Sequence, residues 1–298
     1  MSQKIVVIGS SNTDMVIKTK VFPLPGETVL GQTFLMNPGG KGANQAVAAA
    51  RLGADVRFVA KVGQDIFGNQ AMVDFKKEGL DIDHVSQTPD YPSGIATITV
   101  NDKGENQIIV ASGANMDLKP ADLPDVIFED ASLVLIQLEI PLETVRYIVE
   151  KCRSLQIKLV LNPAPAKPVD DDLLNGLYLI TPNETETEIL TGIVPDSPES
   201  LKKAALFFRK KGVEHVIITL GEKGIYLSNG QYEQIIPAVE VQAVDTTAAG
   251  DVFNGAIVTA LSQGWNWLEA CDFACKASAI SVTRMGAQSS APYQHEMK

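Results

Sequence analysis

The chain has 298 residues, of which 45% are hydrophobic and 20% charged, a composition typical of a folded globular protein and not of a disordered or fibrous one. Its formal net charge of −11, without a lysine- or arginine-rich run, disfavours nucleic acid or an anionic membrane as a partner, and no apolar stretch approaches the ~18 residues of a membrane span. Three cysteines without a C-x-x-C pair, and an N-terminal apolar run too short for a signal peptide, lead us to expect a cytoplasmic protein.

The first predicted element is an apolar strand at residues 5–9, which ends at a glycine. A polar cluster at 10–14 follows the carboxyl end of this strand, where open α/β sheets bind ligands. Asn12 and Asp14 in this cluster are therefore candidate ligand-binding residues. A plain turn is the alternative, because Asn, Asp and Ser are common turn residues.

Two β-rich segments interrupt the α/β pattern. The first, at approximately 15–37, contains alternating residues at 16–19 and 28–30 on either side of a proline-rich turn, with no helix between them. The second, at approximately 92–112, has the pattern of a β-hairpin with its turn at 101–104. Together they predict a small separate sheet that would serve as a lid.

The rest of the chain alternates between strands and helices. We expect strands at 56–62, 133–138, 158–161, 178–181 and 216–220, an alanine-rich helix ending at Leu52, and helices at 65–78, 142–155, 201–211, 249–263 and 267–283. These repeated units imply one α/β domain over 1–298, built on a doubly wound, mostly parallel sheet with helices on both faces.

The motif GGKGAN at 39–44 leads into the alanine-rich helix. It is neither a Walker A loop nor a dinucleotide fingerprint, because Gly42 follows Lys41 and Gln45 stands where the last glycine would be. Its glycines would let a ligand approach the backbone, and the Asn44 amide could bind a neutral hydroxylated ligand. The alternative is a flexible lead into the helix.

The stretch DTTAAGD at 245–251 is the segment around which the chain is organised. Its small residues precede an apolar helix, whose first amides and dipole would attract an anion. Asp251 lies in the first turn of that helix, where its carboxylate could accept a proton from an attacking hydroxyl while the amides stabilise a phosphoryl group. An ordinary acidic cap in a small-residue loop is the alternative.

Further polar groups lie at predicted strand ends, and each has a structural alternative. Glu139 follows the strand at 133–138 but could instead cap the next helix. Asn183 and Glu186 share a helix face suited to Mg²⁺-bound waters and phosphate oxygens, although their spacing also fits a capping box, which we favour locally. The turn at 219–224 could hold terminal phosphates or simply form a hairpin.

Two other chemistries lack the residues that they need. None of the three histidines lies beside a plausible serine or cysteine nucleophile, and no G-x-S-x-G motif occurs. Cys271 and Cys275 lie one helical turn apart and are expected to pack in the core, not to bind zinc.

Taken together, these stretches resemble the ribokinase-like sugar kinases, also called the phosphofructokinase-B family of carbohydrate kinases. The positions that match the two family signatures are 39–44 with Ala46, Gly53 and Gly63, and 245–251 with Gly255 and Ala256. The similarity runs from the first strand to Ala287. Segments 9–14, 39–50, 138–139 and 282–288 are most similar to the ribose-phosphorylating branch of the family.

The resemblance implies transfer of the γ-phosphoryl group of ATP to the 5-hydroxyl of ribose. Asp251 matches the family's general base. The backbone amides that match its anion hole are those of Ala248, Ala249 and Gly250, although many relatives have glycine where Ala248 or Ala249 stands. The positions that match sugar-binding residues are Asn12, Asp14, Gly40, Lys41, Gly42, Asn44, Glu139 and Asp251. The positions that match the nucleotide side are Asn183, Thr219, Leu220, Gly221, Glu222, Lys223, Gly224 and Gly250.

The resemblance also implies two metal ions and a partner. Glu186 would act on Mg²⁺ through water. A monovalent cation, usually K⁺, would be held mostly by carbonyl oxygens at Asp245, Thr247, Ser281, Arg284, Gly286 and Ser290. Because the lids of such proteins pair across a dimer, we also expect a homodimer.

Two alternatives stay open. The same chemistry could act on deoxyribose, fructose, a keto-deoxy acid or a nucleoside, although a polar set including Asn12, Asp14 and Asn44 favours a compact polyol. The motifs contain no arginine for an acid sugar and no evident aromatic pair for a nucleobase. A non-catalytic sugar sensor on the same fold would have no need of the Asp251 carboxylate beside an anion site.

Overall fold

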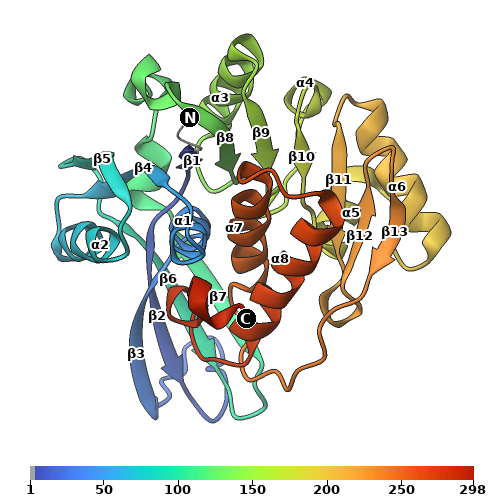
Figure 1. Cartoon of the computed structure of the whole chain (residues 1–298). Coiled ribbons are helices and arrows are strands. Elements are labelled where there is room, and N and C mark those ends of the chain that lie inside the picture. The colour runs from blue at the N-terminus through green and yellow to red at the C-terminus, as the bar shows by residue number, and fades with distance from the viewer. Residues whose placement is uncertain (1–3) are drawn as a thin grey trace.

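A computed structural model of the protein describes residues 4–298, and its centre is a nine-stranded sheet (Figure 1). The strand order is β13-β12-β11-β10-β9-β8-β1-β4-β5, and neighbouring strands are parallel except that β12 pairs antiparallel with both β11 and β13. The strands are β1 (Lys4–Ile8), β4 (Val56–Gly63), β5 (Asp81–Thr88), β8 (Ala131–Ile136), β9 (Lys158–Leu161), β10 (Leu179–Ile180), β11 (His215–Thr219), β12 (Ile225–Ser228) and β13 (Glu233–Ile236). The mostly parallel sheet expected from the sequence is confirmed.

Helices cover both faces of this sheet. They are α1 (Lys41–Arg51), α2 (Ile66–Lys77), α3 (Leu142–Leu155), α4 (Asp171–Leu174), α5 (Glu184–Thr191), α6 (Pro198–Lys210), α7 (Ala249–Ser262) and α8 (Trp267–Val282). Short 3₁₀ helices lie at Gly113–Asp117, Pro120–Asp122, Asp125–Phe128, Gly221–Lys223, Gln288–Ser290 and Gln294–Glu296. Within residues 4–298, none of the helices is both long and apolar enough to cross a bilayer.

Alternate residues of β1 separate the core into two hydrophobic clusters. Ile5 and Val7 belong to the cluster formed with α1, α2, α7 and α8, of which α1, α7 and α8 face the viewer in Figure 1. Val6 and Ile8 belong to the cluster formed with α3, α4 and α6 on the opposite face. Because successive side chains of a strand point to opposite faces, a strand that is apolar throughout is stable only between two helical layers.

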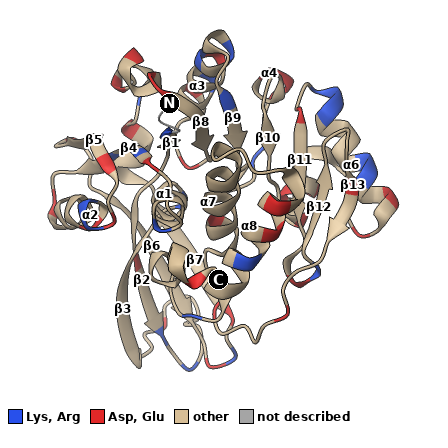
Figure 2. Cartoon of the chain, viewed as in Figure 1, with Lys and Arg blue, Asp and Glu red and all other residues tan. Residues whose placement is uncertain are grey.

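A second sheet of four strands, ordered β3-β2-β6-β7, stands apart from the large one. Its strands are β2 (Asn12–Lys18), β3 (Thr33–Gly39), β6 (Gly94–Val100) and β7 (Asn106–Ala111). Both predicted β-rich segments contribute to it, and β3, β6 and β7 contain no charged residue, so the sheet is mostly tan in Figure 2. The prediction of a β segment at 28–30 is wrong. The strand that pairs with β2 along its whole length is β3, which begins at Thr33, and residues 28–30 lie in the loop before it.

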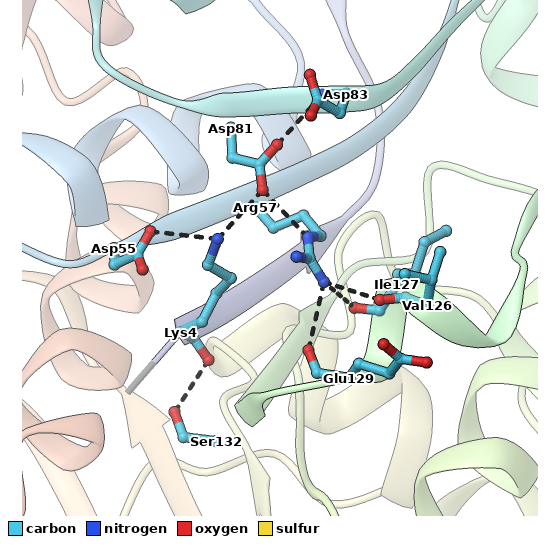
Figure 3. Close-up of polar contacts among 9 residues, drawn as sticks. All are labelled: Lys4, Asp55, Arg57, Asp81, Asp83, Val126, Ile127, Glu129 and Ser132. Atoms are coloured by element: carbon cyan, nitrogen blue, oxygen red, sulfur yellow. Dashed lines mark hydrogen bonds and ion pairs between the residues drawn. The ribbon is translucent and has the colours of Figure 1, made fainter. Parts of the chain in front are cut away.

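A polar network at the amino end of the large sheet fixes its edge strand β5 (Figure 3). Asp81 of β5 accepts hydrogen bonds from Lys4 (3.2 Å) and Arg57 (3.2 Å). Arg57 also donates to the backbone carbonyls of Val126 (3.0 Å) and Ile127 (2.9 Å). These contacts join β1, β4, β5 and the segment before β8, at the end of the sheet opposite the candidate site, which indicates a structural role.

Candidate active site

The polar residues selected from the sequence gather at the carboxyl ends of the central strands. Asn12 follows the end of β1 by four positions, and Glu139 and Asn183 follow the ends of β8 and β10 by three positions each. Asn183 also forms an isolated parallel bridge with Thr219 at the end of β11, so two expected nucleotide-binding positions are adjacent. Helices α1 and α7 begin at this same edge, which brings their positive ends to it.

Helices α1 and α7 pack closely at Gly255, where a Cβ atom would come within 2.7 Å of the Cβ of Ala48 and 2.8 Å of the carbonyl oxygen of Gln45. This packing brings Asp251, one helical turn before Gly255, to the side chains of α1. The Oδ2 of Asp251 accepts a hydrogen bond from Nδ2 of Asn44 (2.9 Å), and its Oδ1 accepts one from Nε2 of Gln45 (2.9 Å). Asp251 is only 7% exposed, so it is a buried carboxylate with both oxygens held by amides.

The turn before α7 leaves backbone amides free at the start of the helix. Ala248 is the N-cap in the left-handed conformation (φ 60°), and the N–H of Ala249 donates to the carbonyl of Thr246 (3.3 Å). Within the part of the chain that the structure describes, the amides of Ala248 and Gly250 have no partner. A Cβ atom at Gly250 would meet nothing within 4 Å, so the space around it is open. Two of the three expected anion-hole amides are therefore free, and the third serves the turn.

The charges of four carboxylates act on the ammonium group of Lys41, namely those of Asp251, Glu139, Glu186 and Asp14. Burial, together with the charges of Glu139 and Asp251, raises the pKa of Asp14 to about 6. Burial lowers the pKa of Lys41, but the carboxylates of Asp251 and Glu139 outweigh it, so this pKa is raised and the ammonium stays charged. The result is a cluster of side chains rich in hydrogen-bond acceptors, which suits a ligand with several hydroxyl donors.

Glu139 serves a different helix from the one suggested by the sequence. Its carboxylate accepts hydrogen bonds from the hydroxyl of Ser10 and from the backbone N–H of Lys41 (3.1 Å), the first residue of α1. The N-cap of α3 is Pro141, and no side chain caps that helix. The alternative in which Glu139 caps the following helix is therefore wrong: it stabilises the amino end of α1, across the site.

The glycines of the GGKGAN motif have a packing role in addition to any role in binding. A Cβ atom at Gly42 would lie 2.6 Å from the carbonyl carbon of Gly9 and from the backbone nitrogen of Ser10. Gly40 has φ 89° and would place a Cβ 2.7 Å from the backbone nitrogen of Asn12. Both positions need glycine so that α1 can start directly against the turn after β1.

Asn12 is fixed by a residue that sequence analysis did not identify. The side chain of Asn115, 2% exposed, donates to Oδ1 of Asn12 (2.8 Å), donates to the carbonyl of Ser11 (3.2 Å) and accepts from the N–H of Ser11 (2.8 Å). Within residues 4–298, the Nδ2 group of Asn12 has no hydrogen-bond partner. Because Asn115 follows Asn12 by 103 positions, no local pattern could have paired them.

The nucleotide-side positions show the local structure favoured from the sequence. Asn183 and Glu186 form a capping box, in which the Asn183 side chain accepts from the N–H of Glu186 (2.8 Å) and Oε2 of Glu186 accepts from the N–H of Asn183 (2.8 Å). Burial raises the pKa of Glu186, although the hydrogen bond from Asn183 opposes it. The turn at 219–224 joins β11 and β12 as a hairpin, and Lys223 lies 3.6 Å from Glu184.

The two segments expected to form a cation loop lie side by side. Asp245 accepts hydrogen bonds from the N–H groups of Thr247 (2.9 Å) and Gly286 (2.9 Å), one to each carboxylate oxygen. The side chains of the other expected positions bind protein groups: Ser281 binds Ser278, Arg284 binds Glu296, and Ser290 binds Ala287. An ion held there would thus depend on backbone carbonyls, as expected for a site that side chains specify weakly.

Comparisons with known proteins point in one direction. The chain matches the pfkB family carbohydrate kinase over residues 2–294. It is 45% identical over 298 residues to ribokinase from Haemophilus influenzae, covering 99% of this chain and 97% of that protein. It is 39% identical over 292 residues to deoxyribokinase from Salmonella typhimurium, covering 97% and 95%. The structure of Arabidopsis thaliana ribokinase complexed with ribose and ATP superposes with a TM-score of 0.93 at 32% identity, covering 100% and 98%.

Proposed function

The chain belongs to the pfkB family of carbohydrate kinases, and we propose that it transfers the γ-phosphoryl group of ATP to the 5-hydroxyl of ribose. Full-length similarity to ribokinases at 40–45% identity supports ribose as the substrate. The observation that carries the chemistry is Asp251, a buried carboxylate in the first turn of α7, beside the free amides of Ala248 and Gly250.

In the proposed reaction Asp251 is the general base. It takes the proton of the 5-hydroxyl as the hydroxyl oxygen attacks the γ-phosphorus, and the bond from that phosphorus to the oxygen bridging to the β-phosphate breaks, so ADP leaves with the electron pair. The amides of Ala248 and Gly250, at the positive end of α7, stabilise the charge on the transferring group. The amide of Ala249 contributes only by holding the turn.

The sugar is proposed to bind through Asn12, Asp14, Lys41, Asn44 and Glu139. The Oδ1 atom of Asn44 is buried and has no hydrogen-bond partner within residues 4–298, while its Nδ2 is bound to Asp251. An unpaired buried acceptor is costly unless a ligand pairs it, and a sugar hydroxyl would do so. Asn44 would thus contact the sugar and the base together.

Magnesium and a monovalent cation are part of the proposal. When bound, Mg²⁺ neutralises charge on the phosphate oxygens during transfer. The capping box uses Oε2 of Glu186, which leaves Oε1 of this buried carboxylate to bind a magnesium-bound water beside Asn183. The segments joined by Asp245 and Gly286 would hold K⁺ through carbonyl oxygens and thereby order the turn that carries the anion hole.

We also propose a homodimer formed through the small sheet, which would act as a lid over the sugar. Ile17 pairs directly with Phe34 on the neighbouring strand. Met36 and Ile109 lie in one row across the sheet, in which Met36 pairs with Met15, Met15 with Thr97, and Thr97 with Ile109. Because Met15 and Ile17 are two residues apart on β2, the side chains of Ile17, Phe34, Met36 and Ile109 share one face. All four are at least 42% exposed. A second copy of this sheet, in which only β2 contains charged residues, is the partner that would cover them. The three buried, unpaired cysteines support a reducing compartment, so we place the protein in the cytoplasm.

The test is ADP release in a coupled assay with ribose, deoxyribose, fructose, a keto-deoxy acid and adenosine, each in K⁺ and in Na⁺. Ribose should dominate, and Asp251→Asn should lower turnover by roughly 10²–10⁴-fold while calorimetry still detects ribose binding. Another sugar in first place would change the substrate and keep the mechanism. Ribose binding without turnover of any sugar would favour the sensor, and near-normal turnover of Asp251→Asn would exclude Asp251 as the base.

A further inference from the structure

A row of buried amide side chains, formed by Gln45, Gln137 and Asn162, is hydrogen-bonded to Asp251 through Gln45. Gln45 is 0% exposed, and its Nε2 donates to Oδ1 of Asp251 (2.9 Å) and to Oδ1 of Asn162 (2.9 Å). Its Oε1 accepts a hydrogen bond from Nε2 of Gln137 (2.6 Å), which is also 0% exposed. Asn162 in turn donates to the carbonyl of Thr181 (3.2 Å).

These contacts leave the Gln45 amide one favourable orientation. Both of its N–H bonds point at oxygen acceptors, and its only oxygen receives a donor. If the amide were reversed, its oxygen would face the oxygens of Asp251 and Asn162, and its nitrogen would face the nitrogen of Gln137. Three hydrogen bonds would then become three repulsions. Gln137 and Asn162 therefore determine which atom Gln45 presents to the carboxylate.

The position of Gln137 comes at a cost to the fold. Its Oε1 is buried without a hydrogen-bond partner within the described residues. A Cβ atom at Gly9 would lie 2.1 Å from this oxygen, so the side chain occupies the space that Gly9 leaves empty. An apolar side chain in this core position would avoid the unpaired oxygen. A contribution to stability therefore does not explain why a glutamine occupies position 137. The hydrogen bond that its Nε2 donates to Gln45 does explain it.

The two amides that hold Asp251 differ in what else they can contact. Asn44 keeps a free acceptor for the sugar, so its hydrogen bond to Asp251 is part of the binding site. Gln45 has all its hydrogen-bonding groups engaged by protein, and no surface exposed. It can therefore affect the reaction only through the carboxylate.

We infer that Gln45, held by Gln137 and Asn162, is a positioning residue that fixes the orientation of the Asp251 carboxylate toward the hydroxyl group of the sugar. This inference rests on the proposed role of Asp251 as general base. It adds a residue that acts on turnover and not on sugar affinity, because only the direction of the base changes when the amide is lost.

The test begins with the wild-type enzyme and whichever sugar it phosphorylates. Gln45→Met keeps the length of the side chain and removes its donors. We expect kcat to fall by about 10–10²-fold, while KM and the calorimetric Kd for the sugar stay within about twofold. In an Asp251→Asn background, the same substitution should give no further loss, because Gln45 acts through the carboxylate that is already gone.

Two further variants keep the test decisive. Gln137→Met leaves the Gln45 amide present but unoriented, so it should lower kcat by a smaller factor, and it serves if Gln45→Met does not fold. Thr259→Val is the matched control, since Thr259 is buried in α7 near Ala49 of α1 and does not contact Asp251; its kcat should be unchanged.

Each outcome separates this inference from the proposed function. An equal loss from Gln45→Met in both backgrounds, or a rise in KM with kcat unchanged, would overturn the positioning role. An unchanged kcat in both folded glutamine variants would overturn it as well. If Asp251→Asn itself retains turnover, Asp251 is not the general base and the proposed mechanism is refuted. The positioning role of Gln45 is then refuted too, because there is no base for it to orient.

Discussion

Asp14→Asn should make the protein more stable and a poorer sugar binder. Burial and the charges of Glu139 and Asp251 raise the pKa of Asp14 to about 6, because the folded chain disfavours the ionised form. In the unfolded chain this carboxyl group titrates near its ordinary value of 3.8. Folding thus becomes less favourable as the pH rises through this interval, since the folded state binds more protons than the unfolded state there.

The size of the effect follows from the difference between the two pKa values. A shift of one unit corresponds to about 1.4 kcal/mol, so a carboxyl group raised to about 6 lowers the free energy of unfolding at pH 7.5 by at most ~3 kcal/mol. Partial exposure of Asp14 reduces this to about 1–2 kcal/mol. The amide of Asn cannot ionise, so the variant should avoid this loss of stability while presenting one acceptor fewer to the sugar.

Urea unfolding of both proteins without sugar, at pH 4 and pH 7.5, tests this reasoning. The variant should be more stable than wild type at pH 7.5 by about 1–2 kcal/mol and nearly equal at pH 4, where Asp14 is protonated in the folded protein. Calorimetry at pH 7.5 should show weaker ribose binding. A variant that is less stable than wild type at pH 7.5 would show that Asp14 supports the fold, and the argument from burial would be refuted.

Three further substitutions test other parts of the site. Gly255→Ala should lower the free energy of unfolding by about 1–3 kcal/mol and reduce kcat, because a Cβ would meet Ala48 at 2.7 Å and force α7 away from α1; thermal unfolding at wild-type Tm would contradict the packing. Glu186→Gln keeps the capping acceptor and removes the charge, so a titration should show a higher Mg²⁺ requirement, by about tenfold, with Tm maintained; an unchanged titration would remove Glu186 from the metal site. Asp245→Ala separates the loops at 245–247 and 284–290, so the ratio of activity in K⁺ to activity in Na⁺ should fall to about one, and a retained ratio would place the cation elsewhere.

The sequence predicted the elements whose pattern depends only on local residues. Strands such as β1 and β8 are apolar after their first one or two residues, which is the pattern of a strand buried on both faces. Their observed bounds differ from the prediction by one or two residues. Helix α3 was predicted with its observed bounds, Leu142–Leu155. Edge strand β5 was not predicted, because six of the eight residues in its sequence DIDHVSQT are polar. It is held in the sheet by Asp81 and its distant partners Lys4 and Arg57.

Within the candidate site, the sequence predicted which residues belong to the site but not which residues would be hydrogen-bonded to each other. The motifs drew attention to Asp251 and Asn44, but nothing local indicated that these residues would be hydrogen-bonded across 207 positions. Gln45 was noticed only because it is not a glycine, since a buried glutamine next to a binding motif has no distinctive spacing. Sequence analysis offered the following helix as the partner of Glu139, because that helix is nearest in the sequence. The observed partners, Ser10 and Lys41, precede Glu139 by 129 and 98 positions.

The distance in sequence between the residues of the site also affects how the protein refolds and whether fragments of it can be active. Asn44 and Gln45 bind Asp251, which lies 206 positions after Gln45 in the sequence. The active site can therefore form only after folding has brought the two ends of this long segment together. Recovery of activity during refolding should therefore be among the last signals to return, after helix content. Neither half of the chain can carry the reaction alone, and two fragments divided in an exposed loop between these positions would become active only on reassociation.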